Sequence, residues 1–316
     1  MNASPLPSPA RSPSAADHRR YQRTGLAYGV IAYAGWGVLP IYFKLLKAVP
    51  AISIVAFRVL FSLVVLAALV AVTGGAPTLR RALKARRTVL LIAASSVLIA
   101  INWVFYIYAV NSGHILAGSL GYYLNPLANI LLGRFFLKER LGALQWAAVA
   151  IAAAGIAVLA AGAIGQLWLS LILCVSFSLY GLVRKIVAAD ALTGLAIETG
   201  MLAPLALGWL VFAHVPGSPP IAPTAHVSLL LALSGLISTT PLLLFTAAAR
   251  RLPYSTMGML QFIAPTIQFL VAVFLYGEPF TRAHAVAFSA IWSALALYSF
   301  ALIRNARRGS PRNADV

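Results

Sequence analysis

Acidic residues are scarce in this sequence. Only 6 of its 316 residues are aspartate or glutamate, whereas 24 are lysine or arginine. No two of the carboxylates are close neighbours along the chain. A membrane enzyme that acts on lipid head groups or prenyl chains needs clustered carboxylates or histidines for acid–base or metal chemistry. The shortage of carboxylates therefore argues against an enzyme.

Cysteine is almost absent. The single thiol, Cys174, excludes an internal disulfide and a metal site made of several cysteines. The 5 histidines share no spacing that is typical of a metal site. A glycine-rich nucleotide-binding loop is also missing, so ATP is not expected to drive the protein. We therefore expect no cofactor and no metal.

Charged residues make up only 9% of the chain, whereas 61% is hydrophobic and the mean hydropathy is +0.89. Apolar runs of roughly twenty residues recur, and only helices or closed barrels span a bilayer. The runs do not alternate, so helices are expected. The formal net charge of +18 would fit nucleic acid, but basic residues also collect in the cytoplasmic loops of membrane proteins. We expect the lipid bilayer, and no nucleic acid, as a partner.

Run lengths predict ten transmembrane helices. The expected spans are about 25–45, 51–72, 88–109, 115–137, 143–162, 167–187, 194–213, 227–249, 254–277 and 283–303. With both termini in the cytoplasm, 20 of the 24 basic residues fall on the cytoplasmic side. Since cytoplasmic loops carry the excess of lysine and arginine, this asymmetry supports the number of helices and their orientation.

One unit occurs twice in the chain. An offset of 139 residues carries Pro126 onto Pro265, Asn129 onto Gln268 and Glu139 onto Glu278. The same offset carries Tyr122 onto Gln261. Because each unit holds an odd number of helices, the second copy enters the membrane from the opposite side. Inverted repeats of this kind are typical of transporters with a binding site near the bilayer midplane.

The predicted fold class is an all-α integral membrane protein of ten transmembrane helices, arranged as two inverted five-helix repeats. The predicted segments are a disordered cytoplasmic tail (about 1–22), a first repeat (about 23–163), a second repeat (about 164–305) and a cytoplasmic C-terminal tail (about 306–316). The small-residue face of the fifth span, with Ala147, Ala150, Ala154 and Gly155, allows close helix contact within the subunit or in a homodimer.

Three motifs stand out along the chain: Trp36-Gly37 followed by Pro40 and Lys44, Asn102-Trp103 followed by Tyr106, and Gly121-Tyr-Tyr-Leu-Asn125-Pro126. They resemble the motifs of the RarD family, in the EamA-type branch of the drug/metabolite transporter superfamily. The resemblance covers about residues 22–305 and implies a bacterial inner-membrane location and export or exchange of small metabolites. Members are commonly labelled chloramphenicol-sensitive proteins or chloramphenicol-resistance permeases. The second half follows the pattern less strictly, with Ala264 in place of Asn125.

Polar groups inside a bilayer are expensive, so they are candidate binding residues. Tyr122, Asn125 and Asn129 share one helical face, and Gln261 and Gln268 share another at repeat-equivalent positions. Either the two faces line a central cavity, or the amides hydrogen-bond between helices as structural contacts. Symmetry favours the cavity.

Further candidates lie on neighbouring spans. Asn102 and Tyr106 share a face of the third span, and Trp36 and Tyr180 open Trp-Gly and Tyr-Gly pairs in the first and sixth. These aromatic rings either stack on a substrate or pack in the core. Pro126 and Pro265 are expected to kink their helices, which either frees carbonyl groups toward the cavity or only bends the helix.

Arg58 and Glu198 are the charged residues clearly within predicted spans. Because the repeats are inverted, we expect the two residues near opposite ends of the membrane, without a direct salt bridge between them. They either act in coupling or gating or lie in interfacial water. Glu198 is the candidate for a coupling proton, since desolvation favours the protonated carboxyl. Glu139 and Glu278 lie at the ends of their helices. They either cap the helix, or pair with Arg140 and Arg282, or form a gating ion pair.

The sequence therefore predicts a secondary transporter, a permease or exporter of small organic metabolites or drugs that works by alternating access and affects chloramphenicol sensitivity. A non-transporting membrane sensor or scaffold is the alternative.

Overall fold

The computed structural model describes residues 15–46, 49–111, 115–161, 165, 167–212, 224–277 and 282–307. Every regular element in these ranges is a helix. Within them, 9 helical segments are long and apolar enough to cross a membrane. The chain is therefore an all-helical, multi-pass membrane protein.

Long helices make up most of the fold. They are α1 (Ala15–Leu45), α2 (Ala51–Val72), α4 (Arg86–Asn111), α5 (Ile115–Phe135), α6 (Ala143–Ala160), α7 (Leu167–Ile186), α8 (Ala191–Phe212), α9 (Ala225–Ala249) and α12 (Arg282–Arg307). Between α9 and α12 the chain forms three shorter segments: α10 (Tyr254–Gln261), α11 (Ile263–Leu270) and the π-helix η2 (Val271–Leu275). The short helix α3 (Ala76–Lys84) follows α2.

Local sequence explains where several helices begin. Gly74 adopts a φ of 65°, which glycine tolerates, and turns the chain from α2 into the polar helix α3. The side chain of Thr224 accepts a hydrogen bond from the Val227 amide and caps α9. Asp190 accepts one from the Thr193 amide at the start of α8. Burial opposes ionisation of Asp190, but hydrogen bonds from Thr193 and from the backbone of Asp190 and Leu192 together outweigh it and lower the pKa of this carboxyl.

The two repeat-related prolines sit in different surroundings. Pro126 lies within α5, which continues past it, whereas the helical segment around Pro265 is broken at Phe262. Proline cannot donate to the carbonyl four residues earlier, which is that of Gln261 in the second case. The break between α10 and α11 therefore falls where Pro265 leaves a carbonyl without its helical donor.

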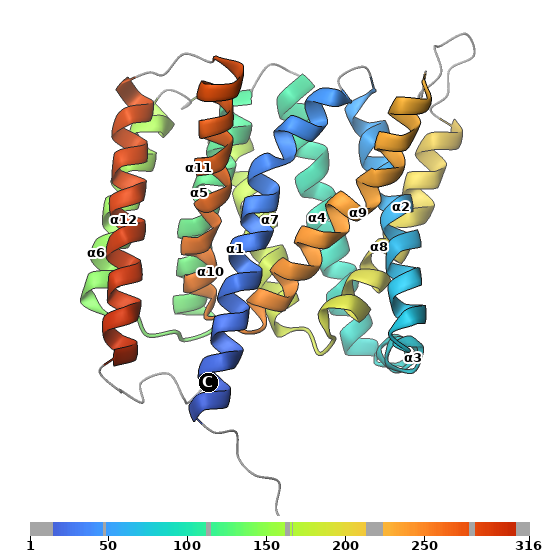
Figure 1. Ribbon diagram of the computed structural model, residues 1–316, viewed down its shortest axis with the longest axis horizontal. Helices are drawn as coiled ribbons and strands as arrows, with labels where there is room; N and C mark the ends of the chain where they lie inside the picture. Colours follow the sequence, from blue (N-terminus) through green and yellow to red (C-terminus); the bar gives the residue numbers. More distant parts are fainter. Residues whose placement is uncertain are drawn as a thin grey trace, which may run out of the picture.

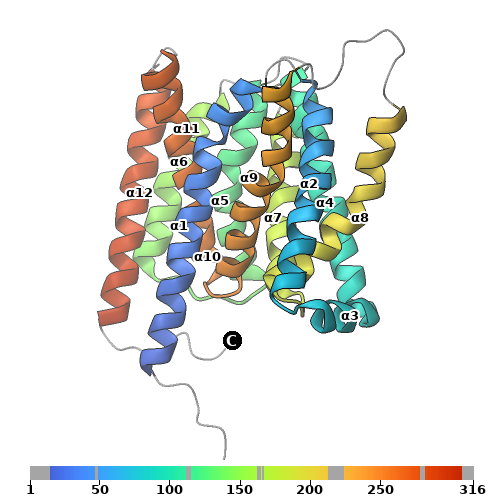
Figure 2. The ribbon, with the colours of Figure 1, turned by 45° about the vertical axis from the view of Figure 1, so that its right-hand side comes forward.

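The helices form one bundle with two edges (Figure 1). At one edge α6 packs against α12, and at the other α2 packs against α8 and α9. The centre contains α1, α4, α5, α7 and α10, with α5 between α7 and α10. The turned view in Figure 2 keeps α6 with α12 and α2 with α8 at these edges. Functional side chains are therefore held by helices that come from both halves of the sequence.

The small-residue face of α6 divides between two environments. Gly155 is buried against α12, where an added Cβ would lie 2.7 Å from the Ala290 Cβ and 3.1 Å from the Ala287 carbonyl oxygen. Ala147, Ala150 and Ala154 are exposed. Close helix contact within the subunit thus uses Gly155, while the alanine side of α6 faces outward.

Several chain features gather at one end of the bundle, which we call the α3 end. It carries α3, the start of α1, the end of α12 and the connections from α5 to α6, α7 to α8 and α9 to α10 (Figure 1). The opposite end, which we call the far end, carries the end of α1 and the starts of α2 and α9. The buried polar groups lie at different levels between these two ends.

Candidate functional site

Two buried amides meet where α5 crosses α10. The Nδ2 of Asn129 donates to the Oε1 of Gln261 at 2.6 Å, and both side chains are buried. The helices come this close because Gly258 faces α5: an added Cβ would lie 2.6 Å from the Pro126 carbonyl oxygen. Thus two predicted binding residues, one from each half of the sequence, are in direct contact.

Unpaired polar atoms lie on the same face of α5 as Asn129. In the described part of the chain, neither amide atom of Asn125 has a hydrogen-bond partner, and the Oδ1 of Asn129 also lacks one. Both residues are at most 1% exposed. Buried polar groups are nearly always paired, so these unpaired atoms require an explanation. A ligand that binds in another conformation of the protein would supply the missing partners. We call Asn125, Asn129 and Gln261 the amide centre.

Asn102 and the tyrosines beside it form a second polar group. The Nδ2 of Asn102 donates to the Leu173 carbonyl oxygen at 3.0 Å and to the Ser176 Oγ at 3.1 Å. The Tyr122 hydroxyl donates to the Oδ1 of Asn102 at 3.4 Å. The rings of Tyr106 and Tyr122 make an edge contact with centroids 5.5 Å apart, and Tyr106 is 41% exposed. Asn102 therefore ties α4 to α7 and orients Tyr122.

Trp36 and Tyr180 belong to one aromatic cluster. The Trp36 ring contacts Phe177 and Phe245 at 6.0 and 5.4 Å between centroids, and Tyr180 stacks on Phe245 at 6.3 Å. Tyr180 is fully buried, whereas Trp36 is half-buried. The packing thus leaves part of the Trp36 ring available for contact with a substrate, while Tyr180 is enclosed by protein.

Gln268 lies apart from the amide centre. It is exposed, and its Nε2 donates to the Trp36 carbonyl oxygen at 3.2 Å, which ties α11 to α1. In agreement with this contact, α11 packs along α1, whereas α5 packs along α10. The two predicted amide faces therefore meet toward the α3 end and diverge toward the far end.

Arg58 projects from α2 near the far end. Its Nε donates to the Ser238 Oγ at 2.7 Å, and its guanidinium carbon lies 5.4 and 5.5 Å from the ring centroids of Phe43 and Trp103. Cations are attracted to aromatic faces at such distances. A hollow of about 20 Å³ adjoins it, which is room for about one water molecule. The hollow is lined by Arg58, Val59, Ser62, Trp103, Leu195, Glu198, Thr199, Leu202, Ser238, Thr239 and Leu242.

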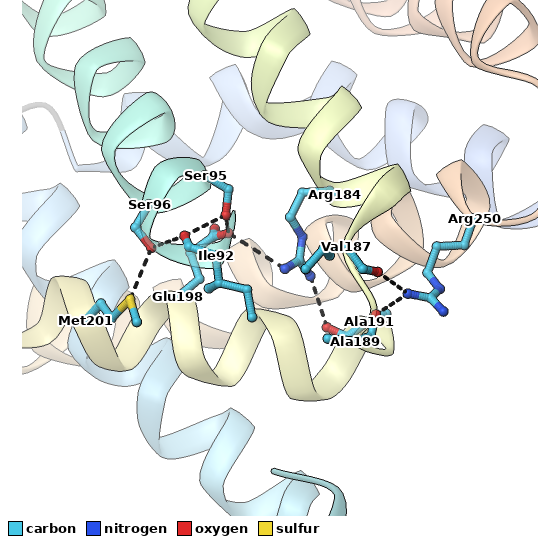
Figure 3. A network of polar contacts seen from close by, with 10 residues as sticks. All are labelled: Ile92, Ser95, Ser96, Arg184, Val187, Ala189, Ala191, Glu198, Met201 and Arg250. Carbon is cyan, nitrogen blue, oxygen red and sulfur yellow. Dashed lines mark hydrogen bonds and ion pairs between the residues drawn. The ribbon is translucent and has the colours of Figure 1, made fainter. Parts of the chain in front are cut away.

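Glu198 borders the same hollow but pairs with another residue (Figure 3). Its Oε2 accepts a hydrogen bond from the Ser95 Oγ at 2.8 Å and lies 3.8 Å from the Nη1 of Arg184. Both charged side chains are buried, and the Nη2 of Arg184 donates to the Ala191 carbonyl oxygen at 3.3 Å. Glu198 is thus part of an intramolecular ion pair that joins α4, α7 and α8.

Arg58 and Glu198 share the hollow without forming a salt bridge with each other. Both residues line it, although we expected them near opposite ends of the membrane. The hollow lies between α2 and α8, which pack against each other, so a residue from each helix reaches it. Their partners nevertheless differ, since Arg58 bonds to Ser238 and Glu198 pairs with Arg184.

Basic side chains also cap helix ends at the α3 end. The Nζ of Lys185 donates to the carbonyl oxygens of Ala249 and Leu252 at 3.0 and 2.6 Å. The Nη1 of Arg250 donates to the carbonyl oxygens of Val187 and Ala189 (Figure 3). Because carbonyls at the end of a helix lack partners within it, these cations satisfy them. The contacts hold the α7–α8 connection against the end of α9.

Glu139 binds the first turn of α10. Its Oε1 accepts a hydrogen bond from the Tyr254 amide, and its Oε2 accepts from the Ser255 amide at 2.9 Å and the Ser255 Oγ at 2.7 Å. A carboxylate is favourable at a helix N-terminus because the free amides and the helix dipole attract negative charge. The capping role expected for Glu139 thus involves a helix of the other half, while Glu278 lies outside the described residues.

Removing the Glu139 carboxylate should destabilise the fold. Substitution of Glu139 by alanine leaves the amides of Tyr254 and Ser255 without this acceptor. Loss of such a cap costs about 0.5–2 kcal/mol, so we expect a fall of that size in the free energy of unfolding in detergent. The neighbouring exposed Arg140→Ala variant is the matched control and should stay within about 0.5 kcal/mol of the wild type. Equal stability of all three proteins would exclude the cap.

Sequence reasoning missed the partners of the two charges within the membrane. The charge asymmetry counts Arg184 with Lys185 among the cytoplasmic basic residues, yet Arg184 is fully buried beside Glu198. One signal was available, because Arg184 falls within the helix α7 rather than after its end. Ser95 and Ser238 gave no signal, because serine is common in membrane helices.

Comparison with known proteins identifies the class. Residues 23–161 match the EamA-like transporter family. An uncharacterized transporter of Pseudomonas aeruginosa is 44% identical over 90% of this chain and 96% of its own length. A solved crystal structure of a protein with 21% identity covers 87% of this chain and 97% of the other, with a TM-score of 0.69, which shows a shared fold. The relatives are named as transporters, not enzymes.

The particular group follows from two other relatives. The protein RarD of Salmonella typhimurium is 42% identical over 90% of this chain and 98% of its own. The chloramphenicol-sensitive protein RarD of Pseudomonas aeruginosa is 34% identical over 92% and 99%. The chain therefore belongs to the EamA-like transporter family and, within it, to the group of RarD proteins, as its motifs indicated.

Proposed function

We propose that the chain is a secondary transporter that moves small organic metabolites or drugs across the bacterial inner membrane by alternating access. Its two inverted five-helix halves would rock around the amide centre, with both termini in the cytoplasm. An ion or solute gradient would supply the energy. Since one relative is named a chloramphenicol-sensitive protein, chloramphenicol belongs among the compounds to be tested.

The helix contacts support the inverted repeat. Under the offset of 139 residues, the pair α1 and α9 corresponds to α7 and α4, and both pairs are in contact. The pair α5 and α7 corresponds to α10–α11 and α1, which are also in contact. Three further pairs, α2 with α8, α6 with α12 and α5 with α10, join equivalent helices. A two-fold axis relates such contacts and would pass between α5 and α10.

The contact between α5 and α10 carries the proposal of alternating access. Two-fold symmetry pairs Asn129 with Gln261 and, equivalently, Tyr122 with Gln268. The first pair is hydrogen-bonded, whereas the residues of the second bond elsewhere, Gln268 to Trp36 and Tyr122 to Asn102. The pair toward the α3 end is thus in contact, whereas the residues of the pair toward the far end have other partners. A transporter must also reach the opposite state, in which the second pair is in contact and the first pair is separated.

Paired cysteines test this motion. In a Cys174→Ala background, Asn129→Cys with Gln261→Cys should be joined readily by a short bifunctional thiol reagent, since the native side chains touch. If the protein alternates, Tyr122→Cys with Gln268→Cys should also cross-link in a substantial fraction of molecules. Either cross-link should abolish flux of a transported compound in proteoliposomes, because it fixes one state.

The outcomes separate a transporter from a scaffold. A static scaffold cross-links only the first pair and gives no flux with labelled chloramphenicol, amino acids or small amines, with or without a proton gradient. The matched control joins α11 to α12 through Thr266→Cys with Trp292→Cys, since the native side chains are hydrogen-bonded at 3.2 Å. This pair should cross-link without blocking flux if the α11–α12 contact is maintained throughout the cycle.

A further inference from the structure

The charges around the hollow do not balance. Arg58 and Glu198 line it, and Glu198 already lies against Arg184. Two arginines and one carboxylate leave one positive charge in excess, because arginine stays protonated in proteins. Among the described residues, no carboxylate oxygen lies within 4.0 Å of Arg58. A charge held within a membrane helix is expensive, so an uncompensated cation there points to a function.

The guanidinium of Arg58 also has free donors. Arginine offers five N–H donors, and in the described part of the chain Nε is the nitrogen of Arg58 that has an acceptor, the Ser238 Oγ. The terminal nitrogens form the planar fork that binds carboxylate-like groups with two parallel hydrogen bonds. The rings of Phe43 and Trp103, 5.4 and 5.5 Å from the guanidinium carbon, attract the cation but carry no charge that neutralises it. Arg58 is thus positioned to receive an anion.

We propose that Arg58 binds the negative charge of the transported molecule, so that the substrate class is an organic monoanion with an apolar body. This inference rests on the proposed transport function and assigns the substrate class to the same protein. The apolar side of the hollow, with Leu195, Leu202 and Leu242, suits a hydrocarbon or aromatic body. Since the hollow has room for only about one water molecule, binding requires α2, α4, α8 and α9 to separate.

Equilibrium binding to the detergent-purified full-length protein tests the substrate class without any need for flux. The probe is radiolabelled benzoate, with benzenesulfonate, benzylamine and benzyl alcohol as competitors of similar size. We expect benzoate to bind and benzenesulfonate to compete, whereas the cation and the neutral alcohol compete at least tenfold more weakly. Arg58→Gln should lose benzoate binding, and Arg58→Lys should weaken it about tenfold, because lysine keeps the charge but lacks the fork.

Lys44→Gln is the matched control. Lys44 is an exposed cation at the end of α1, over the Tyr276 ring, and its loss should leave benzoate binding unchanged. Size-exclusion profiles verify that each variant is folded; if Arg58→Gln is not, Arg58→Lys and the competition series on the wild type decide. The proposal is overturned if folded wild type binds neither anion, if benzylamine competes as well as benzenesulfonate, or if folded Arg58→Gln binds benzoate normally.

Failure of this inference is distinguishable from failure of the transport function. Flux of a cationic or neutral compound that Arg58→Gln retains would keep the transporter and overturn the anion site. Benzoate binding that depends on Arg58, with only the first cysteine pair cross-linking and no flux, would support the anion site and refute alternating access.

Discussion

Replacing Glu198 by glutamine should lower the free energy of unfolding by about 3–5 kcal/mol, because it leaves the fully buried Arg184 without a counter-charge. Glutamine keeps the size of the side chain and an acceptor for the Ser95 hydroxyl, so the loss reports the charge. Arg184 has few other contacts that would compensate for the lost charge. In the described part of the chain its Nε and Nη1 have no hydrogen-bond acceptor. Reversible denaturation of the protein in mixed micelles measures the effect.

A double-mutant cycle isolates the ion pair. Arg184→Gln alone should also be strongly destabilising, while Arg184→Gln with Glu198→Gln should lose clearly less than the sum of the single variants. The exposed Arg134, at the end of α5, supplies the control: Arg134→Gln should change stability by less than about 0.5 kcal/mol. Additive losses would show that the two charges act independently.

This cycle also decides between two functions of Glu198. A carboxyl that carries a coupling proton must become neutral during transport, so a neutral glutamine should be tolerated by the fold while gradient-dependent flux is lost. A structural partner of Arg184 behaves in the opposite way, since the fold itself needs the charge. A stable Glu198→Gln variant with uncoupled flux would therefore favour proton coupling over the structural role.

The all-helical membrane fold could be predicted because long apolar runs determine it. Apolar stretches marked the helices, and the offset of 139 residues pointed to the helices that meet as α5 and α10. Periodicity also placed Asn125 and Asn129 on one face, and both are buried. The RarD membership followed from motifs that lie on α1, α4 and α5.

What could not be predicted depends on helix rotation and register in three dimensions. The repeat suggested equivalent roles for Asn129 and Gln268, yet one is buried in an amide pair and the other is exposed beside Trp36. A symmetric sequence pattern contains no information about which of two equivalent residue pairs is hydrogen-bonded. The pairing of Glu198 with Arg184 was hidden for a similar reason, since the two residues become neighbours only after the chain turns back from α7 into α8.

Substituting Gly258 by alanine should destabilise the protein by about 1–3 kcal/mol, although alanine is the better helix former. An added Cβ would lie 2.6 Å from the Pro126 carbonyl oxygen, 3.0 Å from Ile130 and 3.1 Å from the Asn129 Cβ. The first of these atoms belongs to the backbone of α5 and cannot rotate away. The two helices must therefore move apart, which lengthens the hydrogen bond between Asn129 and Gln261.

Gly200→Ala is the matched control, because Gly200 lies within α8 and an added Cβ would meet nothing within 4 Å. There the helix preference of alanine acts alone, and stability should rise by up to about 1 kcal/mol. Parallel denaturation of the two variants measures the difference. If Gly258→Ala gains stability as Gly200→Ala does, the close crossing of α5 and α10 is wrong. If it loses stability and cross-linking between cysteines at 129 and 261 falls with it, the amide centre depends on this glycine for the contact between α5 and α10.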